Sequence, residues 1–212
     1  MEFTDRQKDI IEQALRIVSE HGIDGLTYRN LAHAVGITEP AFYRHFAGKA
    51  DILMGILEYF DALRRRLFQE IRSEEPRSLK AVEQIFARHL GLFQENPALA
   101  TVLFPEEVRQ GYEGLAARVL EMMKFGQQQI TEIITEGIER GEIRGDLDPE
   151  QVALIVSGSL RIAVHRWRLR GRTGDLQGEG ARLAGTLIAM IRPTDPASAR
   201  ATDGAGRPTQ EG

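Results

Sequence analysis

The sequence predicts an all-helical protein of two domains, and three observations lead to this prediction. Apolar residues recur at three- and four-residue spacing along most of the chain. Two short helical patterns meet at Gly36, within residues 27 to 53. The 212 residues, 42% of them hydrophobic, are enough to bury a substantial core. We expect a three-helix bundle over residues 1–48, a larger helical domain over residues 49–192 and a disordered tail over residues 193–212.

Composition narrows the classes of protein that the chain can belong to. It has no cysteine, which excludes disulfides and zinc–thiolate sites and fits a reducing compartment. The N-terminus lacks the apolar core of a signal peptide, and no later stretch runs uncharged for about 18 residues. We therefore expect a cytoplasmic protein with no membrane partner. The net charge of −4 means that any nucleic-acid-binding surface must be local.

The first three predicted helices form the small bundle. The first runs from about residue 4 to residue 21 and ends at Gly22. Thr27 can cap the second helix, and Gly36 permits the left-handed turn that ends it. Thr38 can cap a third helix over residues 38–45, because its hydroxyl can accept from the amide of Ala41. The apolar positions of the three helices are Ile11, Ala14, Leu15, Val18, Leu31, Ala32, Val35, Ile37, Phe42 and Phe46.

This pattern is a helix-turn-helix, and its ending is specific. The run Tyr43, Arg44, His45 and Phe46, followed by Lys49, resembles the N-terminal domain of the TetR/AcrR family of bacterial transcriptional regulators. The resemblance covers about 50 residues. It implies a double-stranded DNA operator as partner, a homodimer, and a C-terminal domain that dimerises and binds a small-molecule effector. Repression of transcription is the expected activity.

The candidate DNA-binding residues fall into two groups. A recognition helix presents its N-terminal residues to base edges, while flanking side chains hold phosphates. The base-side candidates are Thr38, Glu39, Pro40 and Arg44. By the resemblance, the phosphate-side candidates are Tyr43, His45, Lys49, Thr27 and Tyr28. The alternative is that Arg44 and Lys49 are solvated surface charges and His45 is a packed ring.

The remaining helices are predicted from apolar spacing and capping signals. Long helices are expected over residues 49–72 and 79–94, and a short one follows a cap at Asn96 and reaches residue 104. Glycines within residues 106–140 favour two helices, divided near Phe125. Asp148 and Pro149 open a helix to about residue 170. A glycine-rich connection over residues 171–180 precedes a last helix that ends near residue 191.

The middle helices carry an aromatic and methionine-rich set with few polar groups. Such a set can line a pocket for a hydrophobic effector, although such residues more often form plain core. The candidate ligand-binding residues are Phe60, Phe86, His89, Phe93, Phe104, Tyr112, Met122, Met123, Phe125, Arg161 and His165. His89, Arg161 and His165 are the polar anchors if the effector is polar or anionic.

The last two helices are the expected dimer interface, because in the family these helices pair across a two-fold axis. The interface candidates are Leu160, Val164, Trp167, Leu183, Leu187 and Ile191. The basic run over residues 161–172 lies at a helix C-terminus, where cations are favoured, so packing and solvation explain it better than a phosphate or membrane role. Two recognition helices would then read half-sites about 34–36 Å apart.

Catalysis has little support. The histidines at positions 21, 33, 45, 89 and 165 show no metal-ligand spacing, and neither a phosphate-binding glycine loop nor a nucleophile elbow is present. We expect no enzyme activity, no metal and no cofactor. Two rivals stay open: a DNA-binding regulator or recruiter that needs no ligand, and a helical small-molecule-binding protein or enzyme that only retains the head.

Overall fold

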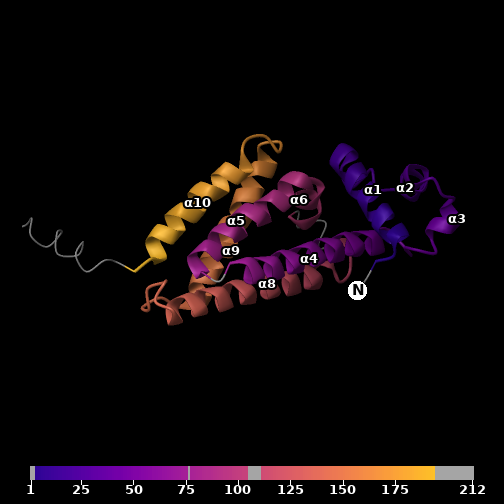
Figure 1. Cartoon of the computed structure of the whole chain (residues 1–212). Helices are drawn as coiled ribbons and strands as arrows, with labels where there is room; N and C mark the ends of the chain where they lie inside the picture. Colours follow the sequence, from indigo (N-terminus) through magenta and orange to yellow (C-terminus); the bar gives the residue numbers. More distant parts are fainter. Residues whose placement is uncertain (1–2, 76, 105–110, 194–212) are drawn as a thin grey trace, which may run out of the picture.

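The computed structural model describes residues 3–75, 77–104 and 111–193, and every regular element in these ranges is an α-helix. This confirms the predicted fold class. Helices α1 (Asp5–His21), α2 (Tyr28–Val35) and α3 (Glu39–Phe42) form a head at one end of the molecule (Figure 1). Helix α4 (Lys49–Glu74) runs from the head into the body. The body also contains α5 (Ser78–Glu95), α6 (Ala98–Leu103), α8 (Leu115–Glu139), α9 (Pro149–Leu169) and α10 (Leu176–Ile191).

Short polar side chains determine where several helices begin. The hydroxyls of Thr4, Thr27 and Thr38 accept hydrogen bonds from backbone amides three residues later, and Thr4 forms a full capping box with Gln7. The carboxylate of Asp148 accepts from two amides in the first turn of α9. Each such cap satisfies donors that would otherwise lack partners and stabilises its helix by about 1 kcal/mol.

Four predicted boundaries were wrong, and the first is the end of the third helix, which was expected at residue 45 and lies at Phe42. Helix α8 is continuous through Phe125, whereas two helices were expected there; the part of that prediction over residues 105–110 lies outside the described residues. Pro97, and not Asn96, occupies the cap position of α6, and the Asn96 amide instead donates to the Leu92 carbonyl. Helix α10 begins inside the glycine-rich stretch, because the Asp175 side chain caps it.

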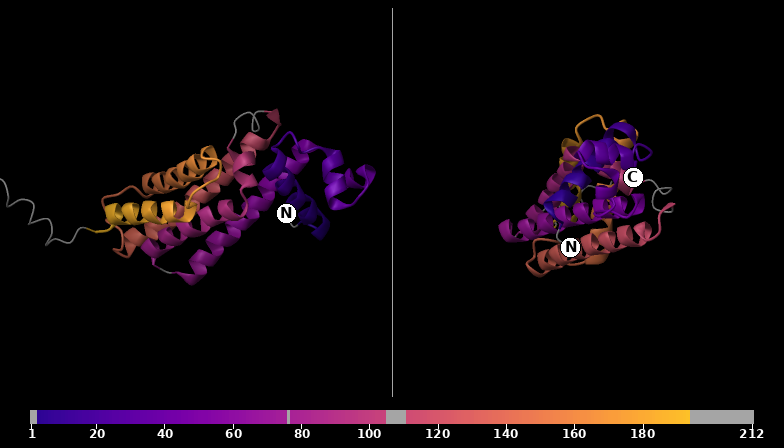
Figure 2. Two further views of the ribbon diagram at one scale, coloured as in Figure 1. Left: turned by 90° about the horizontal axis from the view of Figure 1, so that it is seen from above. Right: turned by 90° about the vertical axis from the view of Figure 1, so that its right-hand side faces the viewer.

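The body is a layered bundle in which α4 and α8 pack against each other and α5 packs on both. Helix α9 packs on α8, and α10 packs on α5. Figure 2 shows α9 and α10 side by side along one flank of the body. Gly180 permits the close approach of α10, since a Cβ at this position would lie 2.2 Å from Cδ1 of Leu90 on α5. No helix in the described part of the chain is long and apolar enough to span a membrane.

The head is joined to the body by packing and by hydrogen bonds. The buried ring of Phe46 lies against Gly55 of α4, where a Cβ would come within 3.0 Å of the ring. Helix α1 packs on α4 and α6. Arg172, between α9 and α10, donates to the hydroxyl and the carbonyl of Ser19 on α1, both at 3.3 Å. The orientation of the head is therefore coupled to α4 and to the α9–α10 turn.

Candidate DNA-binding surface and effector cavity

The turn between α2 and α3 has the geometry of a helix-turn-helix. Gly36 adopts the left-handed conformation, with φ 71° and ψ 37°, and its amide donates to carbonyls of α2. The Ile37 amide donates to the Ala32 carbonyl at 3.0 Å, and Ile37 itself packs against the core. Helix α3 then starts with Thr38 at the cap and Pro40 in the first turn, where a missing amide costs nothing. It is one turn long, and residues 43–45 after it form a turn outside the helix.

Aromatic packing holds α3 against α2. The rings of Tyr28 and Tyr43 lie 4.8 Å apart, and Tyr28 meets the buried Phe42 edge-on at 5.9 Å. Phe42 stacks on Phe46 at 6.1 Å, so one aromatic series runs from the start of α2 to the joint with α4. Tyr43 remains 49% exposed, so it is also part of the outer surface of the head.

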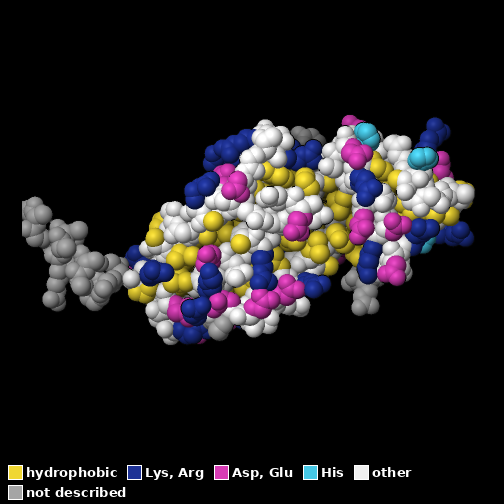
Figure 3. Space-filling model, turned by 45° about the horizontal axis from the view of Figure 1, so that its top comes forward, with side chains coloured by type: hydrophobic (Ala, Val, Ile, Leu, Met, Phe, Trp, Pro, Cys, Tyr) yellow, Lys and Arg dark blue, Asp and Glu magenta, His cyan; other side chains and the backbone are white. Residues whose placement is uncertain are grey.

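The predicted DNA-binding residues lie on the outer surface of the head. Thr27, Thr38, Glu39, Pro40, Tyr43 and Arg44 are exposed, and Tyr28, His45 and Lys49 are partly buried. Neither Arg44 nor Lys49 forms an ion pair with a carboxylate of the described residues, so both cations are available to phosphate. Lys49 is the first residue of α4, where backbone amides also favour an anion. Figure 3 shows Lys and Arg side chains at the end of the molecule that the head forms.

A cavity of about 270 Å³ lies in the body. Its walls come from α4, α5, α8 and α9, with Leu103 of α6 and Phe104 beside it. Seven of the predicted ligand-binding residues line it: Phe60, His89, Phe93, Phe104, Met122, Met123 and Arg161. Apolar walls with a few convergent polar groups are typical of a small-molecule site.

Four predicted ligand-binding residues do not line this cavity. Phe86 is fully buried in the core, because its face of α5 is covered by neighbouring helices. Phe125 points away and lies beneath the guanidinium of Arg65 at 3.9 Å. Tyr112 precedes α8 and packs against the core from outside the cavity. His165 lies behind Phe104, with 5.9 Å between their ring centroids.

Arg64 is the charged cavity residue that the sequence prediction missed, and the other lining residues outside that prediction are uncharged. It is only 7% exposed, yet it lies between Phe60 and Phe68 on the same face of α4. Its spacing of four residues from each of them was the available signal, because that spacing places it on an apolar helical face. Burial lowers the pKa of Arg64 to about 10, against the opposing effect of Asp61, so it stays charged at neutral pH.

An ion-pair cluster beside the cavity links α4 to α8. Arg118 of α8 bonds both carboxylate oxygens of Glu58, at 2.6 and 2.9 Å, and one oxygen of Asp61 at 2.7 Å. Burial pushes the pKa of Asp61 upward, but hydrogen bonds from Arg65 and Arg118 outweigh burial and leave that pKa below its usual range. Asp61 is therefore a carboxylate even though it is 2% exposed.

His89 of α5 faces the same cavity. Burial, reinforced by the positive charge of Arg64, lowers the pKa of His89 to about 3. The imidazole lies 6.2 Å from the ring of Phe60 and 5.5 Å from that of Phe93. It is therefore neutral at physiological pH and offers one donor and one acceptor.

The residues predicted at the dimer interface mostly face inward. Leu160, Val164, Trp167, Leu187 and Ile191 are buried within a single chain, and Leu183 is partly buried against the core. Leu160 and Val164 line the cavity. These residues lie on the inward faces of both helices, because the apolar stripes of α9 and α10 are covered by α5, α6 and α8 within the same chain. The outward faces carry Ile155, Ile162, Leu169 and Met190, and Leu154 is exposed where it lines the cavity.

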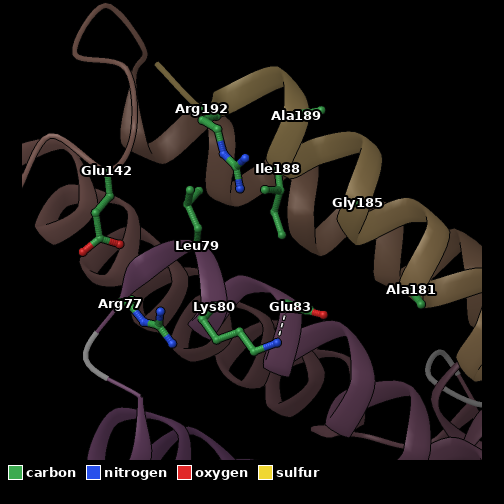
Figure 4. Close-up of a pocket in the computed structure, with 10 residues that line it drawn as sticks. All are labelled: Arg77, Leu79, Lys80, Glu83, Glu142, Ala181, Gly185, Ile188, Ala189 and Arg192. Atoms are coloured by element: carbon green, nitrogen blue, oxygen red, sulfur yellow. Dashed lines mark hydrogen bonds and ion pairs between the residues drawn. The ribbon is translucent and has the colours of Figure 1, made fainter. Parts of the chain in front are cut away.

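A second, open groove of about 760 Å³ separates the start of α5 from α10. Figure 4 shows Arg77 and Lys80 on one side and Arg192 on the other, with Leu79 and Ile188 between them. Lys80 is paired with Glu83 at 2.5 Å. Among the described residues, no group of three or more His, Cys, Asp or Glu side chains could hold a metal ion.

A helix-turn-helix head joined by a long helix to a hollow helical body defines a DNA-binding regulator with a ligand-binding domain. Comparisons with known proteins agree. The family described as "Bacterial regulatory proteins, tetR family" matches residues 10–55, and "Tetracyclin repressor-like, C-terminal domain" matches residues 105–178. The chain belongs to the TetR/AcrR family of transcriptional regulators, DNA-binding repressors with ligand-binding C-terminal domains.

Individual relatives are distant but cover most of the chain. The fatty acid metabolism regulator protein of Bacillus subtilis is 26% identical over 170 residues, covering 79% of this chain and 86% of that protein. The probable acrEF/envCD operon repressor of Escherichia coli K12 is 23% identical over 195 residues, covering 89% and 88%. The structure of FadR from B. subtilis in complex with stearoyl-CoA superposes with a TM-score of 0.75 at 23% identity, covering 87% and 99%.

Proposed function

We propose that two copies of this chain bind a near-palindromic operator and repress transcription until a small, largely hydrophobic effector enters the cavity. In this proposal residues 1–48 read DNA, and residues 49–192 bind the effector and dimerise. The exposed residues Thr38, Glu39, Pro40 and Arg44 contact base edges, and Thr27, Tyr28, Tyr43, His45 and Lys49 contact phosphates. The protein acts in the cytoplasm and has no catalytic role.

One observation carries the proposal: α4 belongs to both functional parts. It starts at Lys49, beside the recognition helix, and its Gly55 receives the ring of Phe46. Further along, its residues Phe60, Arg64 and Phe68 line the cavity. Arg64 lies 15 residues after Lys49, which is about 22 Å along an α-helix. A shift of α4 on ligand binding would therefore move the recognition helix.

The effector releases DNA only if it binds the DNA-free arrangement of the heads better than the DNA-bound one. The name of the B. subtilis relative and the stearoyl-CoA in the FadR structure support an acyl-type effector for this chain. The cavity also favours a sensor over a regulator that needs no ligand, since a body filled by side chains would leave no room for an effector.

The proposed dimer surface is the outward face of α9 together with α10. Ile155, Ile162 and Leu169 on α9 are each at least 51% exposed, and Met190 on α10 is 63% exposed. Exposed apolar side chains that recur along one helix face favour a protein partner. A second copy placed there would set two heads side by side, as two half-sites in successive major grooves require.

The test measures operator affinity with and without an effector. DNA selected by the protein from a random pool supplies the operator, and fluorescence anisotropy at fixed salt gives the Kd. A series of fatty acids and their CoA thioesters is then added at saturating concentration. We expect one member to weaken operator binding at least tenfold and to leave binding to unrelated DNA unchanged. If every compound that binds leaves operator affinity unchanged, the proposal that fatty acids or their CoA thioesters release the protein from DNA is wrong.

A further inference from the structure

Arg64 is a buried cation that hydrogen-bonds no carboxylate. Its guanidinium donates to the backbone carbonyl of Met122 at 3.1 Å, and its buried Nε has no hydrogen-bond partner among the described residues. The nearest carboxylate oxygen is Oδ1 of Asp61, at 3.9 Å, which also has no hydrogen-bond partner there. The other oxygen of Asp61 is taken by Arg65 and Arg118. A buried charge that is not hydrogen-bonded to an opposite charge destabilises the fold, which suggests that Arg64 is present for a function.

Helix α8 is shaped around this guanidinium. A Cβ at Gly126 would lie 2.1 Å from Nη2 of Arg64, so any larger residue there would force the guanidinium to move. Glycine inside a helix costs about 1 kcal/mol relative to alanine. Both Gly126 and Arg64 line the cavity. The backbone of α8 thus leaves space for the guanidinium at the cavity wall, at a cost to the stability of that helix.

His89 lies beside Arg64 on the cavity wall. The Arg64 guanidinium and the His89 imidazole both flank the ring of Phe60, at 5.7 and 6.2 Å from its centroid. A neutral imidazole next to a guanidinium offers an N–H donor where a negative charge would be stabilised. Most of the remaining lining is apolar, and includes Phe68, Ile85, Phe93, Val119, Met122 and Ile130.

We propose that the cavity binds a monocarboxylic acid with an apolar body, whose carboxylate pairs with Arg64 and accepts a hydrogen bond from His89. The inference rests on the proposed function, because it names the class of effector for that same cavity. A volume of 270 Å³ holds roughly nine water-sized groups, which suits a medium-chain acid. A thioester lacks the carboxylate, so the free acid and its CoA ester are distinguishable ligands.

The test uses the full chain, octanoate as probe and octan-1-ol as its neutral isostere, with Kd from calorimetry. We expect octanoate to bind at least tenfold more tightly than octan-1-ol. Arg64→Met is expected to raise the Kd of octanoate at least tenfold and to leave that of octan-1-ol unchanged. Arg66→Met is the matched control on the same helix, because Arg66 is 78% exposed and pairs with Glu70 at the surface. It is expected to change neither Kd.

A second variant keeps the test decisive if Arg64→Met does not fold. Gly126→Ala retains every charge and favours the helix, but its methyl group displaces the guanidinium. It too is expected to raise the Kd of octanoate at least tenfold. Equal binding of octanoate and octan-1-ol by the unchanged protein, or full octanoate affinity in Gly126→Ala, overturns the carboxylate assignment.

Operator release separates this inference from the broader proposal. If octan-1-ol or octanoyl-CoA releases operator DNA and octanoate does not bind, the carboxylate assignment fails while effector release stands. If octanoate binds through Arg64 and operator affinity does not change, the carboxylate site is supported. The release of DNA by this acid is then contradicted. Binding of octanoate with loss of operator affinity, both abolished in Arg64→Met, supports the two together.

Discussion

Glu39 and Lys49 lie on the same exposed surface of the head but carry opposite charges, so they test two kinds of DNA contact. A carboxylate is repelled by phosphate and can accept from cytosine N4. Glu39→Ala is therefore expected to change which operator is preferred, by about 1–3 kcal/mol at one base pair of each half-site. Selection from a random DNA pool measures this. An unchanged consensus with altered affinity alone would contradict a readout role.

Lys49→Ala is expected to act differently. Removing a phosphate contact weakens binding about equally for all sequences and lowers the slope of log K against log salt by about 1 for each protomer. Anisotropy titrations at several salt concentrations, on operator and unrelated DNA, measure both effects. A loss confined to one sequence would show that Lys49 reads bases.

The depressed pKa of His89 predicts a pH dependence of stability. The pKa in the folded protein, about 3, lies below the ordinary 6.5, so the unfolded chain binds the proton more readily. This contribution is complete above pH 6.5 and is lost as the pH falls from 6.5 toward 3, by up to about 1.4 kcal/mol for each pH unit. Urea unfolding of His89→Leu is expected to show a flatter acid profile than the unchanged protein. The exposed His33→Gln is the control, and an equally flat profile for both variants would refute the assignment.

At the scale of elements, Arg118 is one of the residues that link α4 to α8. Arg118→Met leaves Glu58 without this partner and leaves the buried Asp61 with Arg65 as its hydrogen-bonding cation. A destabilisation of about 3 kcal/mol is expected, because removing one member of a buried ion pair exposes the cost of the other. The exposed pair of Arg66 and Glu70 gives the comparison, with at most about 1 kcal/mol lost in Arg66→Met. Denaturant unfolding measures the loss of unfolding free energy in each variant. Similar losses in the two would show that the buried cluster stabilises the protein no more than an exposed ion pair does.

The capping signals were the most reliable guide to these elements. Thr27, Thr38 and Asp148 all cap helices at the positions that the sequence indicates. The errors came from contacts between segments far apart in the chain. Gly126 reads as a helix breaker until Arg64, 62 positions earlier, is seen to occupy the space beside it. Gly180 likewise reads as part of a loop, although it is the residue that lets α10 approach Leu90.

The candidate sites were predictable to different degrees for a related reason. The residues of the head form one continuous local motif, so their exposure followed from the pattern of α2 and α3. Apolar spacing in α9 shows only that one face is buried; it does not say whether a cavity, a neighbouring helix or a second chain covers it. Leu160 and Val164 were therefore assigned to the dimer, whereas they line the cavity.

At the scale of the whole molecule, the outward face of α9 tests the dimer. Ile162→Glu places a charge among exposed apolar residues and is expected to yield monomers with an unchanged fold. Operator affinity then falls at least a hundredfold, because one head makes half of the contacts. Analytical ultracentrifugation and circular dichroism measure these outcomes. Leu120→Glu, on an exposed position of α8, is the control that is expected to remain dimeric.

The ring of Phe46 packed on bare backbone at Gly55 has a consequence for exchanging heads between relatives. The apolar core is continuous from α1 through Phe46 to Ile52, Leu53 and Ile56, so the seam between the halves does not fall at the residue where α4 begins. In a chimaera joined before Lys49, the relative's residue at the position of Phe46 would face α4 of this chain. The new head would then pack poorly on that helix. A junction after Ile56 transfers the head together with the first part of α4, against which the head packs.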